Sequence, residues 1–532
     1  MRGRKVFALL MAMRTGKTKV VVDDWGELLT EEKVDDLLVV APGGAYLTWI
    51  AAIKADLPED IYRAGRVYPW VSKRAKTVAD KNIRQVFMEH KGPRILLINS
   101  EALSAVEEAR NFVTEFLNQR RCMFVFDESV IMKEVDSIIG KFCVKVALHA
   151  SHRRILTGLA TPRSPLDLFN QFWFLDPRIL GFVNFVAYRE RYAEVEKVCM
   201  LPNQVLKGKL KGMAGVLRYR PPALLKRTAA TLDPTLNVNA MSPLALKQWI
   251  ETWVEGVDRQ GTIEAITRLG GYVQTIPIVK TYKNEAELHD KIAPHSFRVR
   301  LEDCYDMPAS DYSFWDVSMS PDQQRIYKEL KAEAVALISG QDFVTATHVI
   351  TQMLRLHQVL CGYTVDDDGK KHFIPERRTA ELVKLLRNYE GKAIVWCSYD
   401  YSVQKVSMAL TDEFGEGSVA RFWGGNVGVR ESEEVRFRTE SGCRFMVSTP
   451  DAGGRGRDWS VADLCVYYSS RNNLDHRQQS EERCKAVGKM KAVAYIDMIT
   501  RDTVEEKIIE ALRKKIDMAA LINGDTWREW LV

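Results

Sequence analysis

The sequence has no hydrophobic run long enough to cross a membrane and no cysteine spacing typical of a zinc site. A membrane-spanning helix needs about 20 consecutive apolar residues, and no stretch approaches that length. The nine cysteines are scattered between Cys122 and Cys484 without a Cys-x-x-Cys pair. Such an odd, unspaced set of cysteines argues against disulfides, so we expect reduced thiols and a cytoplasmic location. Because a membrane-spanning run is lacking, we expect no membrane partner.

The sequence also lacks a strong excess of charge of either sign. Lysine and arginine number 76, and aspartate and glutamate 70, which gives a formal net charge of +6 at pH 7. A mildly basic chain permits a nucleic-acid partner but does not require one. The chain is too long for one ordinary core, and its length suggests roughly three or four domains.

A candidate phosphate-binding loop is present near the start of the chain. It follows a strand-like apolar run at residues 6–11 and leads into a segment with helical spacing. Lys17 would reach the β- and γ-phosphates, and Thr18 would offer its hydroxyl to Mg²⁺. Met11 stands where the usual pattern begins with Gly or Ala, so a chance Gly-Lys-Thr in a turn is the alternative. The residues expected to bind the nucleotide here are Arg14, Thr15, Gly16, Lys17 and Thr18.

A carboxylate pair follows one of the buried strands that the sequence predicts. Strand-like runs at residues 37–41, 94–99, 122–126 and 153–157 alternate with helical stretches, as in a parallel α/β sheet. The third run is followed directly by Asp127 and Glu128. Asp127 would hold Mg²⁺ through water, and Glu128 would orient or deprotonate the attacking water. The alternative is a solvated helix N-cap.

Several segments resemble the conserved blocks of helicase superfamily 2. Residues 171–177, Gln-Phe-Trp-Phe-Leu-Asp-Pro, point to its SWI/SNF-like remodelling ATPases, and the chain looks like the compact members that phages and bacteria encode. The resemblance implies two RecA-like parallel-sheet lobes with a mostly helical insertion between them, with ATP and Mg²⁺ as cofactors and double-stranded DNA as partner. The residues whose blocks imply contact with DNA in this first part are Pro42, Trp49, Ser100 and Thr157.

A second α/β unit is predicted from strand-like runs at residues 393–397, 444–448, 464–468 and 493–498. Residues 452–459 resemble the family's AGGxGxNL loop, which implies that Gly453 approaches DNA while Gly456 and Asp458 approach the nucleotide. Residues 477–489 resemble the RxQAEDRxxRxGQ block, which implies that Gln479 and Arg483 face the γ-phosphate. The alternatives for Arg483 are an i,i+4 contact with Gln479 or a surface ion pair with the adjacent glutamate.

The expected domains are a first lobe at residues 1–180, an insertion at 181–375 that faces DNA, and a second lobe at 376–532. The insertion has helical stretches at 244–257 and 323–338 and a basic segment that includes Lys207, Lys209 and Lys211. This segment either meets DNA phosphates or is an ordinary solvated insertion, and the sequence does not separate these readings.

The sequence departs from the family pattern at three places. Val130 stands where the family carries a histidine after Asp-Glu-Ser, and Ala486 occupies the position of the second arginine in the last block. The ten residues before Met11 are too few for the family's adenine-reading glutamine block. We therefore expect either a truncated start or relaxed base selectivity, and we assign ATP by resemblance.

The leading hypothesis is an ATP-dependent translocase or remodelling motor on double-stranded DNA, which would remodel forked or branched DNA or displace proteins rather than separate strands. It would act as a monomer or with a replication or recombination partner. The first alternative is an ATP-gated DNA clamp or assembly factor with weak or absent hydrolysis, which the changes at Val130 and Ala486 suggest. An RNA-directed helicase is a further alternative, which the SWI/SNF-like residues 171–177 disfavour.

Overall fold

The computed structural model describes most of the chain and divides it into two compact units. The first unit contains Met1–Tyr192, Tyr282–Arg325 and His357–Val532, and the second contains Ala193–Thr281 and Ile326–Leu356. The described residues are 1, 3–43, 46–158, 160–161, 164–199, 226, 229–230, 233, 235–242, 245–246, 248–249, 275–306, 308–339, 346–365, 370–453, 457–471, 473–486, 488–510 and 512.

A seven-stranded parallel sheet forms the first α/β lobe of the larger unit. Its strand order is β3-β4-β2-β5-β6-β1-β9, and every neighbouring pair is parallel. Most of these strands are near-continuous apolar runs, which suits strands that are covered on both faces. The bounds are β1 Val6–Met11, β2 Asp36–Ala41, β3 Arg66–Pro69, β4 Arg94–Asn99, β5 Cys122–Asp127, β6 His152–Leu156 and β9 Ser296–Val299.

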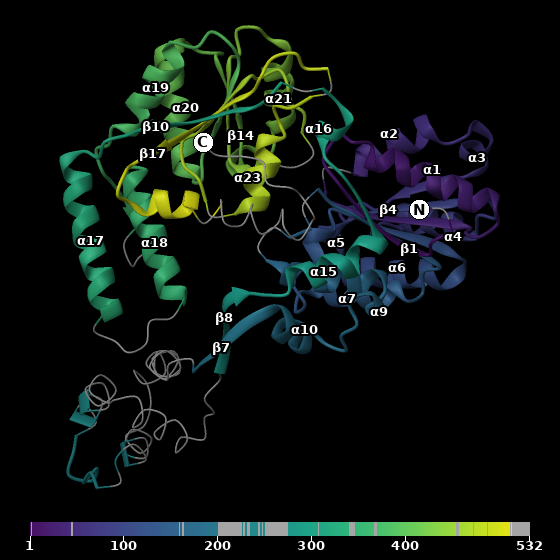
Figure 1. Cartoon of the computed structure of the whole chain (residues 1–532), viewed down its shortest axis with the longest axis horizontal. Coiled ribbons are helices and arrows are strands. Elements are labelled where there is room, and N and C mark those ends of the chain that lie inside the picture. The colour runs from purple at the N-terminus through teal and green to yellow at the C-terminus, as the bar shows by residue number, and fades with distance from the viewer. Residues whose placement is uncertain are drawn as a thin grey trace. The chain divides into compact units, whose positions relative to one another are not determined.

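Helices cover both faces of this sheet. Figure 1 shows α1 (Lys17–Thr30) and α2 (Tyr46–Asp56) on one side of the strands, and α6 (Glu107–Gln119) and α7 (Ile138–Ala147) on the other. The other helices of this lobe and of the segments that adjoin it are α3 Glu59–Ala64, α4 Val78–Glu89, α5 Ser100–Ala105, η1 Ser129–Met132, η2 Pro165–Asp167, α8 Leu168–Leu175, α9 Pro177–Leu180, α10 Phe185–Tyr192, α15 Glu285–Ile292, η3 Ala293–His295 and α16 Leu301–Cys304.

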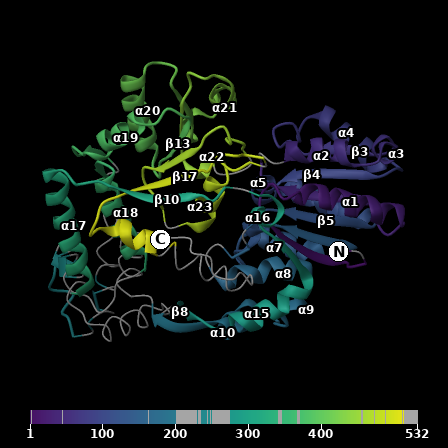
Figure 2. The same ribbon diagram turned by 45° about the horizontal axis from the view of Figure 1, so that its top comes forward.

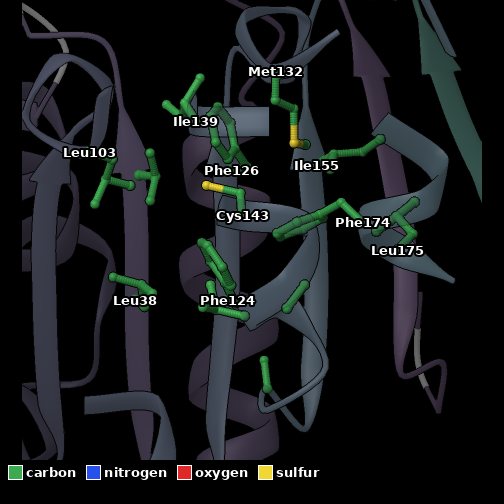
Figure 3. Close-up of a cluster of buried hydrophobic side chains, with 14 of the residues drawn as sticks. Leu38, Leu103, Phe124, Phe126, Met132, Ile139, Cys143, Ile155, Phe174 and Leu175 are labelled. Atoms are coloured by element: carbon green, nitrogen blue, oxygen red, sulfur yellow. The ribbon is translucent and has the colours of Figure 1, made fainter. Parts of the chain in front are cut away.

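The two faces of the sheet have separate hydrophobic cores. Alternate residues of β5 point to opposite faces, so Phe124 and Phe126 enter one core whereas Met123 and Val125 enter the other. Figure 3 shows the first of these cores, where the two phenylalanines lie among side chains from α7 and α8. This packing fixes the carboxyl end of β5, where the predicted carboxylate pair begins.

A six-stranded parallel sheet forms the second lobe. Its order is β10-β17-β16-β13-β15-β14, with β10 beside β17 at one edge (Figure 2). Helices α19 and α20 pack on one face, and α21 packs on the other. The bounds are β10 Asp311–Asp316, β13 Ala393–Trp396, β14 Val419–Phe422, β15 Phe445–Ser448, β16 Leu464–Tyr467, β17 Ala494–Ile499, α19 Arg378–Arg387, α20 Asp400–Phe414, η4 Gly424–Asn426, α21 Arg430–Thr439, α22 Pro450–Gly453 and α23 Leu474–Glu481.

The strand pairing confirms the prediction of two parallel-sheet α/β lobes. Strands β9 and β10 lie within the range expected to be a mostly helical insertion with few strand-like runs. Between residues 181 and 375 the structure also has β7 Ala193–Cys199, β8 Thr275–Tyr282, α17 Pro321–Ser339, α18 Ala346–Leu360, β11 Tyr363–Val365 and β12 Lys371–Phe373. The helix expected at 323–338 lies within α17, and the one expected at 244–257 lies largely outside the described residues.

Two expectations from composition can be compared with the described residues. Eight of the cysteines, namely Cys122, Cys143, Cys304, Cys361, Cys397, Cys443, Cys465 and Cys484, are free thiols, and all of these but Cys304 are buried. In that same part of the chain, no helix is both long enough and apolar enough to span a bilayer.

Candidate nucleotide-binding site

The loop between β1 and α1 folds back on the end of its strand. Gly16 precedes α1 with φ 88°, a left-handed conformation that glycine adopts without strain. The Thr15 hydroxyl donates to the Ala12 carbonyl at 2.7 Å, and the Lys17 ammonium donates to the Met11 carbonyl at 3.0 Å. These contacts hold the lysine ammonium over the loop at the start of a helix, where backbone N–H groups favour an anion.

The carboxylate pair lies beside this lysine. Lys17 Nζ is 4.0 Å from Glu128 Oε1. Asp127 is buried, and its two oxygens accept hydrogen bonds from the Trp49 indole (2.9 Å) and from the Glu128 backbone N–H (3.0 Å). Burial raises the pKa of Asp127, although the Lys17 charge and the Trp49 hydrogen bond both act to lower it. The indole therefore stabilises the charged form of a carboxylate that burial disfavours.

Trp49 and Thr157 are thus connected to the carboxylate pair. Trp49 has no exposed surface, so its side chain offers nothing to DNA in this structure, whatever its block implies by resemblance. The Thr157 hydroxyl donates to Glu128 Oε2 at 3.4 Å. Pro42, Ser100 and Thr157 are buried as well. No local sequence pattern indicates the contact between Trp49 and Asp127, because that contact depends on how α2 packs on the sheet.

Arg483, which follows α23 in the second lobe, reaches the phosphate loop of the first. Its side chain is buried and donates to the carbonyls of Gln479 (2.8 Å) and Arg457 (2.5 Å), and its remaining nitrogen contacts the sulfur of Met13. Burial lowers the pKa of Arg483 to about 10, and the neighbouring Arg14 acts in the same direction. The guanidinium therefore remains charged at neutral pH and lies next to the loop that carries Lys17.

Gln479 and Glu482 complete the surroundings of this arginine. The Gln479 amide donates to Asp475 at 2.7 Å, which holds the glutamine side chain on its own helix. Burial raises the pKa of Glu482, whereas the charges of Lys485, Arg483 and Lys17 oppose that effect. The carboxylate of Glu482 therefore lies among cations from both lobes.

A second contact between the same two segments joins Arg14 to Asp458. Arg14 Nη2 lies 2.7 Å from Asp458 Oδ1. The pKa of Asp458 is lowered because a hydrogen bond with Ser460 and the Arg14 charge outweigh burial. Gly456, the other residue expected near the nucleotide in this loop, lies outside the described residues, as do Lys207, Lys209 and Lys211.

The loop that carries Asp458 is fixed by close packing and by one buried acid. A Cβ at Gly453 would lie 2.3 Å from the Trp459 ring, so only glycine fits there. Glu434 of α21 accepts from the Trp459 indole at 3.0 Å and from Arg457 at 2.8 Å. This contact holds the backbone carbonyl of Arg457 where Arg483 donates to it.

The arrangement suits Mg²⁺ better than a metal held by protein alone. Within the described residues, no group of three or more His, Cys, Asp or Glu side chains could hold a metal ion. Mg²⁺ is usually bound by one or two carboxylates together with substrate phosphates. Thr18, in the first turn of α1, and Asp127, held by two donors next to Lys17, fit that pattern.

Fold and site together define an α/β protein with two parallel-sheet lobes and a Gly-Lys-Thr loop that an arginine from the second lobe approaches. Several curated proteins are similar to the chain over most of its length. The chain is 21% identical to Protein CHROMATIN REMODELING 19 of Arabidopsis thaliana over 76% of its length, and 21% identical to ATP-dependent helicase fft2 of Schizosaccharomyces pombe over 96%. It is 22% identical to TATA-binding protein-associated factor MOT1 of Saccharomyces cerevisiae over 79%. These relatives are SWI/SNF-family ATPases, which confirms the resemblance that the sequence motifs indicate.

The chain spans about half or less of these curated relatives, namely 52%, 39% and 21% of their lengths. Among solved structures, the chain is similar to the Sulfolobus solfataricus SWI2/SNF2 ATPase core in complex with dsDNA. That similarity has 15% identity and a TM-score of 0.34, and it covers 98% of this chain and 90% of that one. No family model matches the chain.

Proposed function

We propose that this protein is an ATP-dependent motor that translocates on double-stranded DNA. The observation that carries the proposal is the approach of Arg483 to the loop that holds Lys17, because it joins groups from both lobes at one phosphate site. Nucleotide binding at such a site would couple the two lobes, and differential affinity for DNA in the open and closed states would then move the duplex.

Each residue around the loop has a chemical role in this proposal. Lys17 and Arg483 stabilise charge on the transferred phosphoryl group, and Gln479 faces the same phosphate as Arg483. Glu128 orients the attacking water and accepts its proton, and Thr157 positions Glu128 through the 3.4 Å contact. Thr18 and Asp127 would hold Mg²⁺, which supplies charge neutralisation on the phosphates. Trp49 acts here as a positioning residue for Asp127.

The DNA part of the proposal is supported by the relatives, whose names describe chromatin remodelling, a helicase and a TATA-binding protein-associated factor. The basic residues Lys207, Lys209 and Lys211 are DNA contacts that we propose for this chain, and Gly453, which is buried against the Trp459 ring, would approach DNA through its backbone. Forked or branched DNA, a replication or recombination partner, the host cytoplasm and the compact phage or bacterial type are the finer parts of the same proposal.

Phosphate release from ATP, measured with and without linear and forked duplex DNA, tests the proposal. We expect turnover that duplex DNA increases, and a loss of at least 100-fold in Lys17→Ala because the phosphates lose their main cation. The same assay with matched duplex RNA distinguishes a DNA motor from an RNA-directed helicase, because only the helicase should release phosphate faster with RNA than with DNA. Equal rates with and without DNA, or an unchanged rate in Lys17→Ala, would refute the motor.

A second candidate is an ATP-gated DNA clamp with weak or absent hydrolysis. Val130 favours it, because this buried apolar side chain provides no polar group next to the carboxylate pair. Ala486 favours it as well, because arginines on a transferred phosphoryl group contribute about 10³–10⁵ in rate. A gel shift that responds to ATP, together with undetectable phosphate release, would support the clamp over the motor.

A further inference from the structure

Arg14 has a backbone conformation that a residue with a side chain rarely adopts. Its φ is 64°, in the left-handed region that glycine enters freely. Residues held in such strained conformations persist where the surrounding structure fixes them, and they are concentrated at functional sites. A glycine at position 14 would avoid the strain, so the arginine side chain is the feature that needs an explanation.

The contacts of the Arg14 guanidinium leave one nitrogen available. Nη2 donates to Asp458 at 2.7 Å, whereas Nη1 is buried and has no hydrogen-bond partner among the described residues. A buried N–H group without an acceptor is unfavourable and is rare in native structures. Arg483 lies close enough for its pKa to be lowered by the Arg14 charge. Two guanidinium groups and Lys17 therefore gather at one loop, and a polyanion would satisfy all three.

We infer that Arg14 donates from Nη1 to the terminal phosphate of the bound nucleoside triphosphate and supplies the second guanidinium that position 486, an alanine, does not. Asp458 is a positioning residue: it holds one nitrogen of the fork and so points the other at the phosphate. This inference rests on the proposed nucleotide binding and adds a further group that favours a triphosphate over a diphosphate.

Competition of ADP and of a non-hydrolysable ATP analogue against a fluorescent nucleotide tests the inference in Arg14→Gly. We expect the affinity for the ATP analogue to fall about tenfold, the size of one charge-assisted hydrogen bond, and the affinity for ADP to change less than about twofold. The melting temperature should equal or exceed that of the wild type, because glycine relieves the strained φ. Arg121→Gln is the matched control, since Arg121 forms a comparable ion pair with Asp35 just before strands β5 and β2, at the opposite end of the sheet.

Two further variants separate this role from a purely structural one. Asp458→Asn should lose part of the ATP preference in the wild-type background and nothing more in the Arg14→Gly background, because it acts through Arg14. Ala486→Arg should restore ATP preference in Arg14→Gly and add little to the wild type. Equal losses for the ATP analogue and ADP, or an unchanged ATP affinity, would overturn the inference while leaving nucleotide binding intact. A wild-type protein that binds neither nucleotide would refute the proposed function as well.

Discussion

Replacing Trp49 with phenylalanine tests whether a buried indole maintains the charge of the carboxylate that is proposed to hold Mg²⁺. The substitution keeps an aromatic ring in the core but removes the N–H that lies 2.9 Å from Asp127 Oδ2. A hydrogen bond to a charged group contributes ~1.5–3 kcal/mol, and one pKa unit corresponds to about 1.4 kcal/mol. The pKa of Asp127, which burial already raises, should therefore rise further, because the charged form loses a hydrogen bond.

The pH dependence of stability follows from the fact that the buried site favours the protonated, neutral form of Asp127. Because the folded protein binds the Asp127 proton more tightly than the unfolded chain does, stability falls as pH rises from about 4 through the folded-state pKa. Trp49→Phe widens that range, so it should lose more stability at neutral pH than at acidic pH. If Asp127 acts as a carboxylate, the acidic limb of the ATPase profile should move to higher pH.

Trp25→Phe is the matched control for this experiment. Trp25 is fully buried in the same core as Trp49, but its indole N–H has no hydrogen-bond partner among the described residues. The control removes the same atoms without removing a hydrogen bond, so its stability loss should not depend on pH. Thermal unfolding and ATP turnover of both variants, each measured from pH 5 to 9, compare the two. An unshifted profile in Trp49→Phe, or the same shift in both variants, would refute the reasoning.

Two further predictions concern the second lobe. Gly453→Ala should destabilise the protein by ~1–3 kcal/mol in chemical denaturation, because its Cβ would lie 2.3 Å from the Trp459 ring, whereas Gly442→Ala, in open space, should change little; equal effects would contradict the packing argument. Glu505→Gln should lower the free energy of unfolding by about 3 kcal/mol at neutral pH, because it breaks a buried pair with Arg378. Burial raises the pKa of Glu505, but the Arg378 charge outweighs burial and holds that pKa at about 2. The stability that the ion pair contributes should therefore be present above pH ~4.5 and lost as pH falls toward 2, where the wild type and Glu505→Gln should become equally stable. A difference between the two proteins that does not change with pH would contradict this prediction.

The strands that the sequence predicted are those with continuous apolar runs. β2, β4 and β5 are buried along almost their whole length, so composition alone marks them. β9 and β10 are half-exposed edge strands that contain polar residues. The parallel partner of β9 is β1, hundreds of positions earlier in the chain, and that of β10 is β17, nearly two hundred positions later. No local pattern could therefore assign these two strands.

The site was predictable to a similar degree. The Gly-Lys-Thr loop and the Asp-Glu pair are local patterns, and the structure brings Lys17 and Glu128 within 4.0 Å. The left-handed backbone of Arg14 and Glu128 was not predictable, because neither residue type favours it without tertiary contacts. The inward orientation of Trp49 depends on the packing of α2 on the sheet, which no local pattern specifies; a DNA contact for Trp49 was implied only by the resemblance.

The edge strands have a practical consequence for anyone who divides this protein into pieces. β9 pairs with β1, and β10, which begins twelve residues after β9 ends, pairs with β17. A shortened N-terminal fragment that stops at residue 192 would leave the backbone of β1 open on one side, and open strand edges promote aggregation. An independently folding first half should instead join residues 1–192 directly to 282–299, so that β9 pairs with the open edge of β1.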